Sequence, residues 1–83
     1  MILVYDFKEE RVNKAHKLAR QYLYWRQRSV FDGNINKEDL DELITKLNQL
    51  IVPDEDFAIL YIMKTQDCEV LAFGKKVPDY EIV

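Results

Sequence analysis

The chain has 83 residues, of which 48% are hydrophobic and 33% charged, and its formal net charge is −3. This length predicts one domain over residues 1–83, and the composition excludes a disordered or low-complexity protein. One cysteine excludes an internal disulfide, and one cysteine with one histidine cannot build a tetrahedral zinc site. Small domains bury only about 60–65% of their unfolded surface, so we expect oligomerisation to stabilise this one.

The sequence gives no sign of a membrane segment or of export. No apolar run approaches the roughly 18 residues of a membrane span, and no basic-then-apolar leader opens the chain. The lone thiol of Cys68 fits a reducing compartment. We therefore expect a cytoplasmic protein with no membrane partner.

The first expected elements are a strand and a helix. Residues 2–7 form a short apolar run that includes Asp6, which predicts a buried strand with an acid near its end. A helix is expected from Glu9 to Tyr24, because apolar residues recur there at steps of three and four. Its apolar positions are Val12, Ala15, Leu18, Ala19, Tyr22 and Leu23.

The rest of the chain predicts one more helix and four strand-like segments. Residues 27–33 alternate like a strand. A second helix is expected to start at the N-cap Asn36 and to end before Pro53. Residues 57–63 and 69–73 predict two further strands, and residues 80–83 a last β-prone piece.

This order predicts an α+β, ferredoxin-like sandwich with an antiparallel sheet and two helices on one face. The pattern is β-α-β-α-β-β, which has one strand fewer between the helices than the ferredoxin-like βαββαβ order. Residues 2–5 and 57–63 are apolar at nearly every position, which is typical of strands buried on both faces. Because the helices can cover only one face, we expect an identical subunit to cover the other by two-fold symmetry.

Positive charge is concentrated near the start of the chain. Residues 8–28 hold seven basic and two acidic residues, a net charge of +5, so the remainder carries −8. This segment favours sequence-independent contact with the phosphates of duplex DNA, although a solvated helix face would look the same. The candidate binding residues are Arg11, Lys14, Lys17, Arg20, Arg26 and Arg28.

Asp6 is the candidate metal ligand. If a two-fold axis lies nearby, two copies of Asp6 would face each other and suit a hard, oxygen-ligated cation such as Mg²⁺. Such a cation activates water and offsets charge at a phosphodiester. The alternative is that Asp6 only ends the strand and caps the turn that follows.

Three segments together resemble a known family. These are Ile-Leu-Val-Tyr-Asp-Phe at residues 2–7, the pattern Gln-x-Ser-Val-Phe-x-Gly at residues 27–33, and the late apolar strand at residues 57–63. In sequence and spacing they resemble the Cas-two family of CRISPR-associated proteins, which are partners of the Cas-one integrase in acquiring new spacers.

The resemblance implies a ferredoxin-like fold and a dimer through sheet faces, with the C-terminal strand added to the partner's sheet. It implies that Asp6 binds Mg²⁺ at the dimer interface. Tyr5 matches the aromatic residue before that acid, and Ser29 and Phe31 match positions tied to nuclease activity in some members. Arg26 and Arg28 would extend the phosphate-binding surface.

Three functions follow as alternatives. The first is a DNA-binding adaptor that bridges integrase subunits during spacer acquisition. The second is a magnesium-dependent nuclease that cuts double-stranded DNA or single-stranded RNA. The third is a VapD-like toxin ribonuclease.

Overall fold

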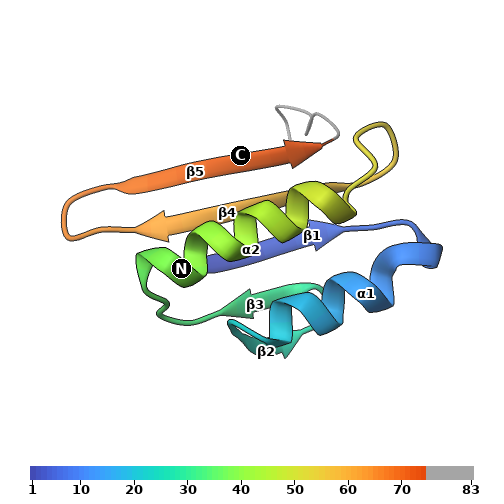
Figure 1. Ribbon diagram of the computed structural model, residues 1–83. Helices are drawn as coiled ribbons and strands as arrows, with labels where there is room; N and C mark the ends of the chain where they lie inside the picture. The colour runs from blue at the N-terminus through green and yellow to red at the C-terminus, as the bar shows by residue number, and fades with distance from the viewer. Residues whose placement is uncertain (75–83) are drawn as a thin grey trace.

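One antiparallel sheet organises the fold, and both helices lie on the same face of it (Figure 1). The computed structural model describes residues 1–74. The elements are β1 (Ile2–Asp6), α1 (Glu9–Arg20), β2 (Tyr24–Gln27), β3 (Val30–Asp32), α2 (Lys37–Leu50), β4 (Phe57–Met63) and β5 (Cys68–Gly74).

The five strands lie side by side in the order β2-β3-β1-β4-β5, and each neighbouring pair is antiparallel. From β1 to β4 the elements follow the βαββαβ order of the ferredoxin-like fold. β5 then folds back on β4 and forms one edge of the sheet. The predicted α+β, ferredoxin-like class is therefore confirmed, and the expected strand at residues 80–83 lies outside the described residues.

The region between the two helices differs from the prediction. Helix α1 ends at Arg20 instead of Tyr24, and residues 24–32 form a hairpin instead of one strand over 27–33. Its turn lies at Arg28 and Ser29, and Arg28 has a φ of 42°. The apolar spacing of Tyr22 and Leu23 continues the helical pattern, but pairing of β2 with β3 decides the conformation of the residues that follow. This hairpin supplies the strand that the predicted order lacked.

The core lies between the sheet and the helices. Leu3, Phe31 and Leu60 project from three adjacent strands and are fully buried. Leu43 and Leu47 of α2 pack on them from above. The side-chain oxygen of Asn36 accepts the Asp39 N–H at 2.8 Å, which confirms the predicted cap of α2.

The other face of the sheet carries no helix, yet its side chains are largely apolar. Alternation along the strands places Ile2, Val4, Ile59 and Tyr61 on this helix-free face, where each is only half-buried. Met63 at the end of β4 is 52% exposed. This is the arrangement expected for a sheet that is covered on its second face by another molecule.

Candidate functional site

Asp6 is the last residue of β1 and lies exposed at the end of the helix-free face. Its backbone is paired with Phe57 of β4, and its side chain points to the same side as Val4 because side chains alternate along a strand. Among residues 1–74, the Asp6 carboxylate forms no hydrogen bond or ion pair. Both of its oxygens are therefore free to bind a ligand.

The chain directly after Asp6 is held by a second carboxylate, Asp56. Asp56 is fully buried and accepts the backbone N–H groups of Lys8 at 2.8 Å and Val52 at 2.9 Å. It also accepts Arg11 Nε at 2.7 Å and Arg11 Nη2 at 2.9 Å. Because Asp56 precedes β4 and Lys8 precedes α1, these bonds tie the connection between Asp6 and α1 to the start of β4.

The charge of Asp56 is stabilised by these contacts. Burial alone would raise the pKa of its carboxyl group, but the hydrogen bond from Arg11 and the backbone N–H groups of Lys8 and Val52 outweigh it and lower the pKa to about 2. The same hydrogen bond, followed by the one to Glu55, raises the pKa of Arg11. Asp56 and Arg11 therefore stay charged throughout the physiological pH range.

Tyr5, Ser29 and Phe31 lie close together, but not beside the Asp6 carboxylate. The Tyr5 N–H donates to the Ser29 carbonyl oxygen at 3.2 Å, and the Tyr5 ring stacks on Phe31 with centroids 6.0 Å apart. Tyr5 is 3% exposed and Phe31 is fully buried, both on the helix-covered side. Burial raises the pKa of the Tyr5 phenol, and its hydrogen bond with Ser29 acts in the opposite direction. These rings pack on the helix-covered side of β1, on the opposite face from the Asp6 carboxylate.

Metal ligands are sparse within one chain. No three His, Cys, Asp or Glu side chains of residues 1–74 gather where they could hold a metal ion. A single Asp6 supplies one carboxylate. One carboxylate suits Mg²⁺ only where the ion keeps several waters or gains a ligand from another chain.

The six predicted nucleic-acid-binding residues fall into two groups. Lys14, Lys17 and Arg20 are exposed on the outer side of α1, and Arg28 is exposed at the hairpin turn. The other two are engaged in ion pairs: Arg11 binds Asp56 and Glu55, and Arg26 Nε lies 2.8 Å from the Asp32 carboxylate. The structure thus brings together on one helix three cations that have no acidic partner within residues 1–74. We name these three residues, Lys14, Lys17 and Arg20, the basic face of α1.

Sequence reasoning missed the role of Asp56. In the sequence Asp56 is the last of three consecutive acidic residues, with nothing to set it apart, whereas in the structure it is the buried partner of Arg11. Its partner could not be identified without the fold.

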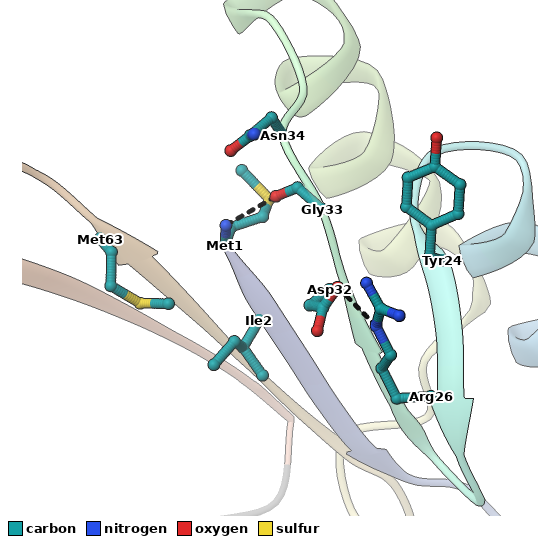
Figure 2. A pocket seen from close by; sticks show the side chains of 8 residues that line it. All are labelled: Met1, Ile2, Tyr24, Arg26, Asp32, Gly33, Asn34 and Met63. Carbon is teal, nitrogen blue, oxygen red and sulfur yellow. Dashed lines mark hydrogen bonds and ion pairs between the residues drawn. The ribbon is translucent and has the colours of Figure 1, made fainter.

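One hollow lies at the opposite end of β1 from Asp6, about 13 Å away along the strand. It has a volume of about 540 Å³ (Figure 2). Four of its polar groups bind each other in pairs: the N-terminal amine donates to the Gly33 carbonyl oxygen at 2.7 Å, and Arg26 pairs with Asp32. It is lined by Met1, Ile2, Tyr24, Arg26, Asp32, Gly33, Asn34 and Met63. This hollow is therefore not part of the site around Asp6.

None of the helices within residues 1–74 is both long enough and apolar enough to cross a membrane.

Comparison with known proteins identifies the family. The sequence profile of the family described as CRISPR associated protein Cas2 matches residues 1–70. The chain belongs to the Cas2 family. It is the family that the motifs of the sequence resemble.

Individual relatives of this Cas2-family chain cover its whole length. It is 35% identical to the CRISPR-associated endoribonuclease Cas2 2 of Archaeoglobus fulgidus, over 100% of this chain and 94% of that protein. It is 32% identical to the CRISPR-associated endoribonuclease Cas2 of Thermococcus kodakarensis, over 100% of this chain and 98% of the relative.

A solved structure supports the fold. The structure titled "Crystal structure of cas2" has 36% sequence identity to this chain and superposes with a TM-score of 0.59. The superposition covers 94% of this chain and 77% of the other.

Proposed function

We propose that this Cas2-family chain acts in the cytoplasm as a homodimer that binds duplex DNA and bridges subunits of the Cas-one integrase during spacer acquisition. We further propose that Asp6 gives the dimer a magnesium-dependent phosphodiesterase activity. The observation that carries the proposal is that two opposite surfaces of the subunit differ in character, one apolar and one basic. The helix-free face is apolar and ends at Asp6, whereas the opposite side presents the basic face of α1.

The helix-free face supports the homodimer. Ile59 lies near its centre and is flanked by Val4 on β1 and Ala72 on β5 in the strand register. An uncovered apolar surface of this kind is unfavourable in water, and a second copy supplies a matching apolar surface through a two-fold axis. A stable interface of about 1,200–2,000 Å² would cover it.

The basic face of α1 supports duplex binding. Lys14, Lys17 and Arg20 are exposed and carry no acidic partner among the described residues. In a two-fold dimer each copy contributes one such face, so a duplex could contact both through its phosphates. Contacts with phosphate alone carry no sequence information, which suits a protein that must accept varied DNA.

Phosphodiester cleavage is supported by the free Asp6 carboxylate and by the relatives, which are named endoribonucleases. Asp6 fits Mg²⁺ in the chemistry of its donor, a charged and unengaged oxygen ligand. When bound, Mg²⁺ would supply an activated water and offset charge at the phosphodiester. The backbone of Asp6 is held in place on both sides. It pairs with Phe57 of β4, and two residues later the Lys8 N–H donates to Asp56. The family match lends no support to a VapD-like toxin ribonuclease.

Asp6→Asn separates bridging from cleavage. The substitution removes one negative charge per subunit, so hydrolysis of RNA and duplex DNA should collapse while dimerisation and duplex binding persist. Spacer acquisition in cells, together with co-purification of the integrase, then reports the bridging role. Asp54→Asn is the matched control, because Asp54 is an exposed carboxylate in a neighbouring turn.

The outcomes distinguish the two parts of the proposal. Acquisition that persists without cleavage assigns the chain an adaptor role in which hydrolysis is dispensable. Loss of both, with dimer and DNA binding intact, makes metal chemistry part of acquisition. Cleavage by purified Asp6→Asn at the wild-type rate would refute the assignment of Asp6, and failure to co-purify the integrase with or without duplex DNA would refute the bridging role.

A further inference from the structure

The sheet edge formed by β2 carries two aromatic rings that the fold leaves exposed. Tyr24 is 70% exposed and Trp25 is 54% exposed, whereas Phe31, which pairs with Trp25 in the adjacent strand, is fully buried. The β2 strand lies at the end of the strand order, so no further strand within residues 1–74 covers this edge. Leaving two large rings in water costs free energy that the fold itself does not recover.

Trp25 is exposed but not free to turn. Its indole Nε1–H donates to the Arg28 carbonyl oxygen at 2.9 Å. On its other side the His16 ring meets it edge-on, with centroids 5.1 Å apart and planes at 79°. These two contacts hold the ring in one orientation while more than half of the side chain stays accessible. A ring fixed in this way loses little further entropy when a ligand stacks on it.

Positive charge surrounds the same ring. A hollow of about 490 Å³ is lined by Arg20, Leu23, Tyr24, Trp25 and Arg26. Arg20 has no acidic partner among the described residues, and Arg28 is exposed at the adjacent turn. Arg26 is partly neutralised, because its Nε lies 2.8 Å from Asp32 and its guanidinium lies over the Tyr24 ring at 5.9 Å. The hollow therefore combines a fixed aromatic surface with a net excess of cations.

From this combination we propose that the hollow between the end of α1 and β2 binds one unpaired nucleotide, whose base stacks on Trp25 and whose phosphate contacts Arg20. Base stacking on aromatic side chains beside cationic groups is the usual means of holding single-stranded nucleic acid. A protein partner of apolar character would match the ring but not the arginines around it.

The site is continuous with the surface proposed for duplex DNA. Arg20 belongs both to the basic face of α1 and to this hollow. A strand that follows the phosphate-binding helix would therefore reach Trp25 where its pairing ends. The inference rests on the nucleic-acid binding proposed above and adds to it a preference for unpaired ends.

The chain provides its own probe, because Trp25 is its only tryptophan. Full-length protein is titrated with a short oligothymidylate, a short oligouridylate, a blunt DNA duplex, and the same duplex with single-stranded ends. Tryptophan fluorescence should be quenched by the oligonucleotides and by the duplex with single-stranded ends, but little by the blunt duplex. Comparison of the two oligonucleotides tells whether the site takes DNA or RNA.

Affinity measured by anisotropy of labelled nucleic acid supplies the second readout. Trp25→Ala should weaken binding of the unpaired ligands by roughly 5- to 150-fold, the range found for loss of one base–aromatic stack. Trp25→Phe keeps a ring and should weaken it less. Lys14→Glu serves as the matched control. It should weaken binding of the blunt duplex and leave the preference for single-stranded ends over blunt ends unchanged. Circular dichroism checks that each variant is folded.

Failure of this inference is distinguishable from failure of the proposed function. If blunt and single-stranded-ended duplexes bind equally well to wild type and to folded Trp25→Ala, the stacking site is refuted while duplex binding stands. If the oligonucleotides quench Trp25 and the blunt duplex does not bind at all, the stacking site stands and the duplex role fails. If tryptophan fluorescence per molecule falls as the protein concentration rises in the absence of nucleic acid, Trp25 lies in a protein interface and the inference is overturned.

Discussion

At the scale of single residues, one buried carboxylate determines how Arg11 is used. Arg11 lies in the basic segment and was predicted to bind phosphate, yet its guanidinium is bonded to Asp56 and Glu55. Two further bonds to Asp56 come from backbone N–H groups of Lys8 and Val52. Removal of the carboxylate would leave the partly buried Arg11 with only Glu55 and Glu10, and two backbone N–H groups without an acceptor, which is costly.

We expect Asp56→Ala to destabilise the fold by about 3–5 kcal/mol, the range for breaking a buried ion pair by removal of one partner. Urea denaturation followed by circular dichroism measures the loss. Asp54→Ala removes an exposed acid from the same turn and should change stability by less than about 0.5 kcal/mol. Similar stability of the two variants would show that the Asp56 cluster does not hold β4 to α1.

The same residue predicts an acid transition. The folded pKa of Asp56 is about 2, below the value of about 3.9 expected for an unfolded chain. A lowered folded pKa stabilises the protein above the unfolded pKa, and this contribution disappears as the pH falls from about 4 toward 2. Urea midpoints measured across this range should fall for wild type. In Asp56→Asn, whose amide does not titrate there, the fall should be smaller; an identical fall would assign the transition to other carboxylates.

At the scale of the element, α1 has two sides with different tasks. Ala15, Leu18 and Ala19 are buried against the sheet, and Lys14, Lys17 and Arg20 face outward. Glu9 and Glu10 lie in the first turn and Lys17 and Arg20 in the last turn, an arrangement that also favours the helix dipole. Charge on the outer side can therefore be reversed without disturbing the core.

Lys14→Glu combined with Lys17→Glu should weaken duplex binding regardless of sequence. Each lost phosphate contact should reduce the slope of log affinity against log salt by about 0.9. Filter binding or anisotropy at several salt concentrations provides both quantities. Lys37→Glu with Lys64→Glu makes the same change in net charge on exposed residues outside α1. An equal effect of both double variants would mean that net charge alone, not the basic face of α1, controls binding.

At the scale of the whole molecule, the sheet has one face covered by helices and one apolar face without them (Figure 1). The radius of gyration of 12.2 Å is close to the roughly 12 Å expected for a folded chain of this length. The described part of the chain thus reaches normal compactness as one subunit. The helix-free face is an extended apolar surface that this subunit leaves uncovered, so association through it would be stabilising.

Ile59→Lys tests that association. Ile59 points to the helix-free face and is only half-buried in the single subunit, so a lysine there should be tolerated by the folded subunit but not by an interface. We expect the dissociation constant of the dimer to rise at least about 30-fold, the effect of losing a central interface residue. Light scattering over a range of concentrations measures it, with Thr45→Lys on the exposed side of α2 as the control. A wild-type protein that is monomeric throughout would refute the dimer.

Much of the fold could be predicted because its signals are local. The N-cap Asn36 predicted where α2 begins, and Pro53 predicted that it ends before that residue. The apolar run at residues 57–63 matches β4 at both ends. The helix follows from hydrogen bonds between near neighbours and from the periodicity of apolar side chains, and the strand from its continuous apolar run. The exposure of Lys14 and Lys17 also followed from that periodicity, and the structure places both at the surface.

The tertiary structure alone decided where α1 ends, which cation is engaged and which ring is exposed. Residues 22–24 continue a helical pattern, but β2 forms because it pairs with β3. Arg11 is bound to a carboxylate 45 residues away, and Trp25 is exposed while Phe31 beside it is buried. Each of these outcomes depends on contacts between residues that are distant along the chain or on a position at the sheet edge. Neither kind of information is present in local spacing. The sequence by itself determined most of the elements and the exposed charges of Lys14, Lys17 and Arg20, and the tertiary structure determined the end of α1, the β2–β3 hairpin and the partner of Arg11.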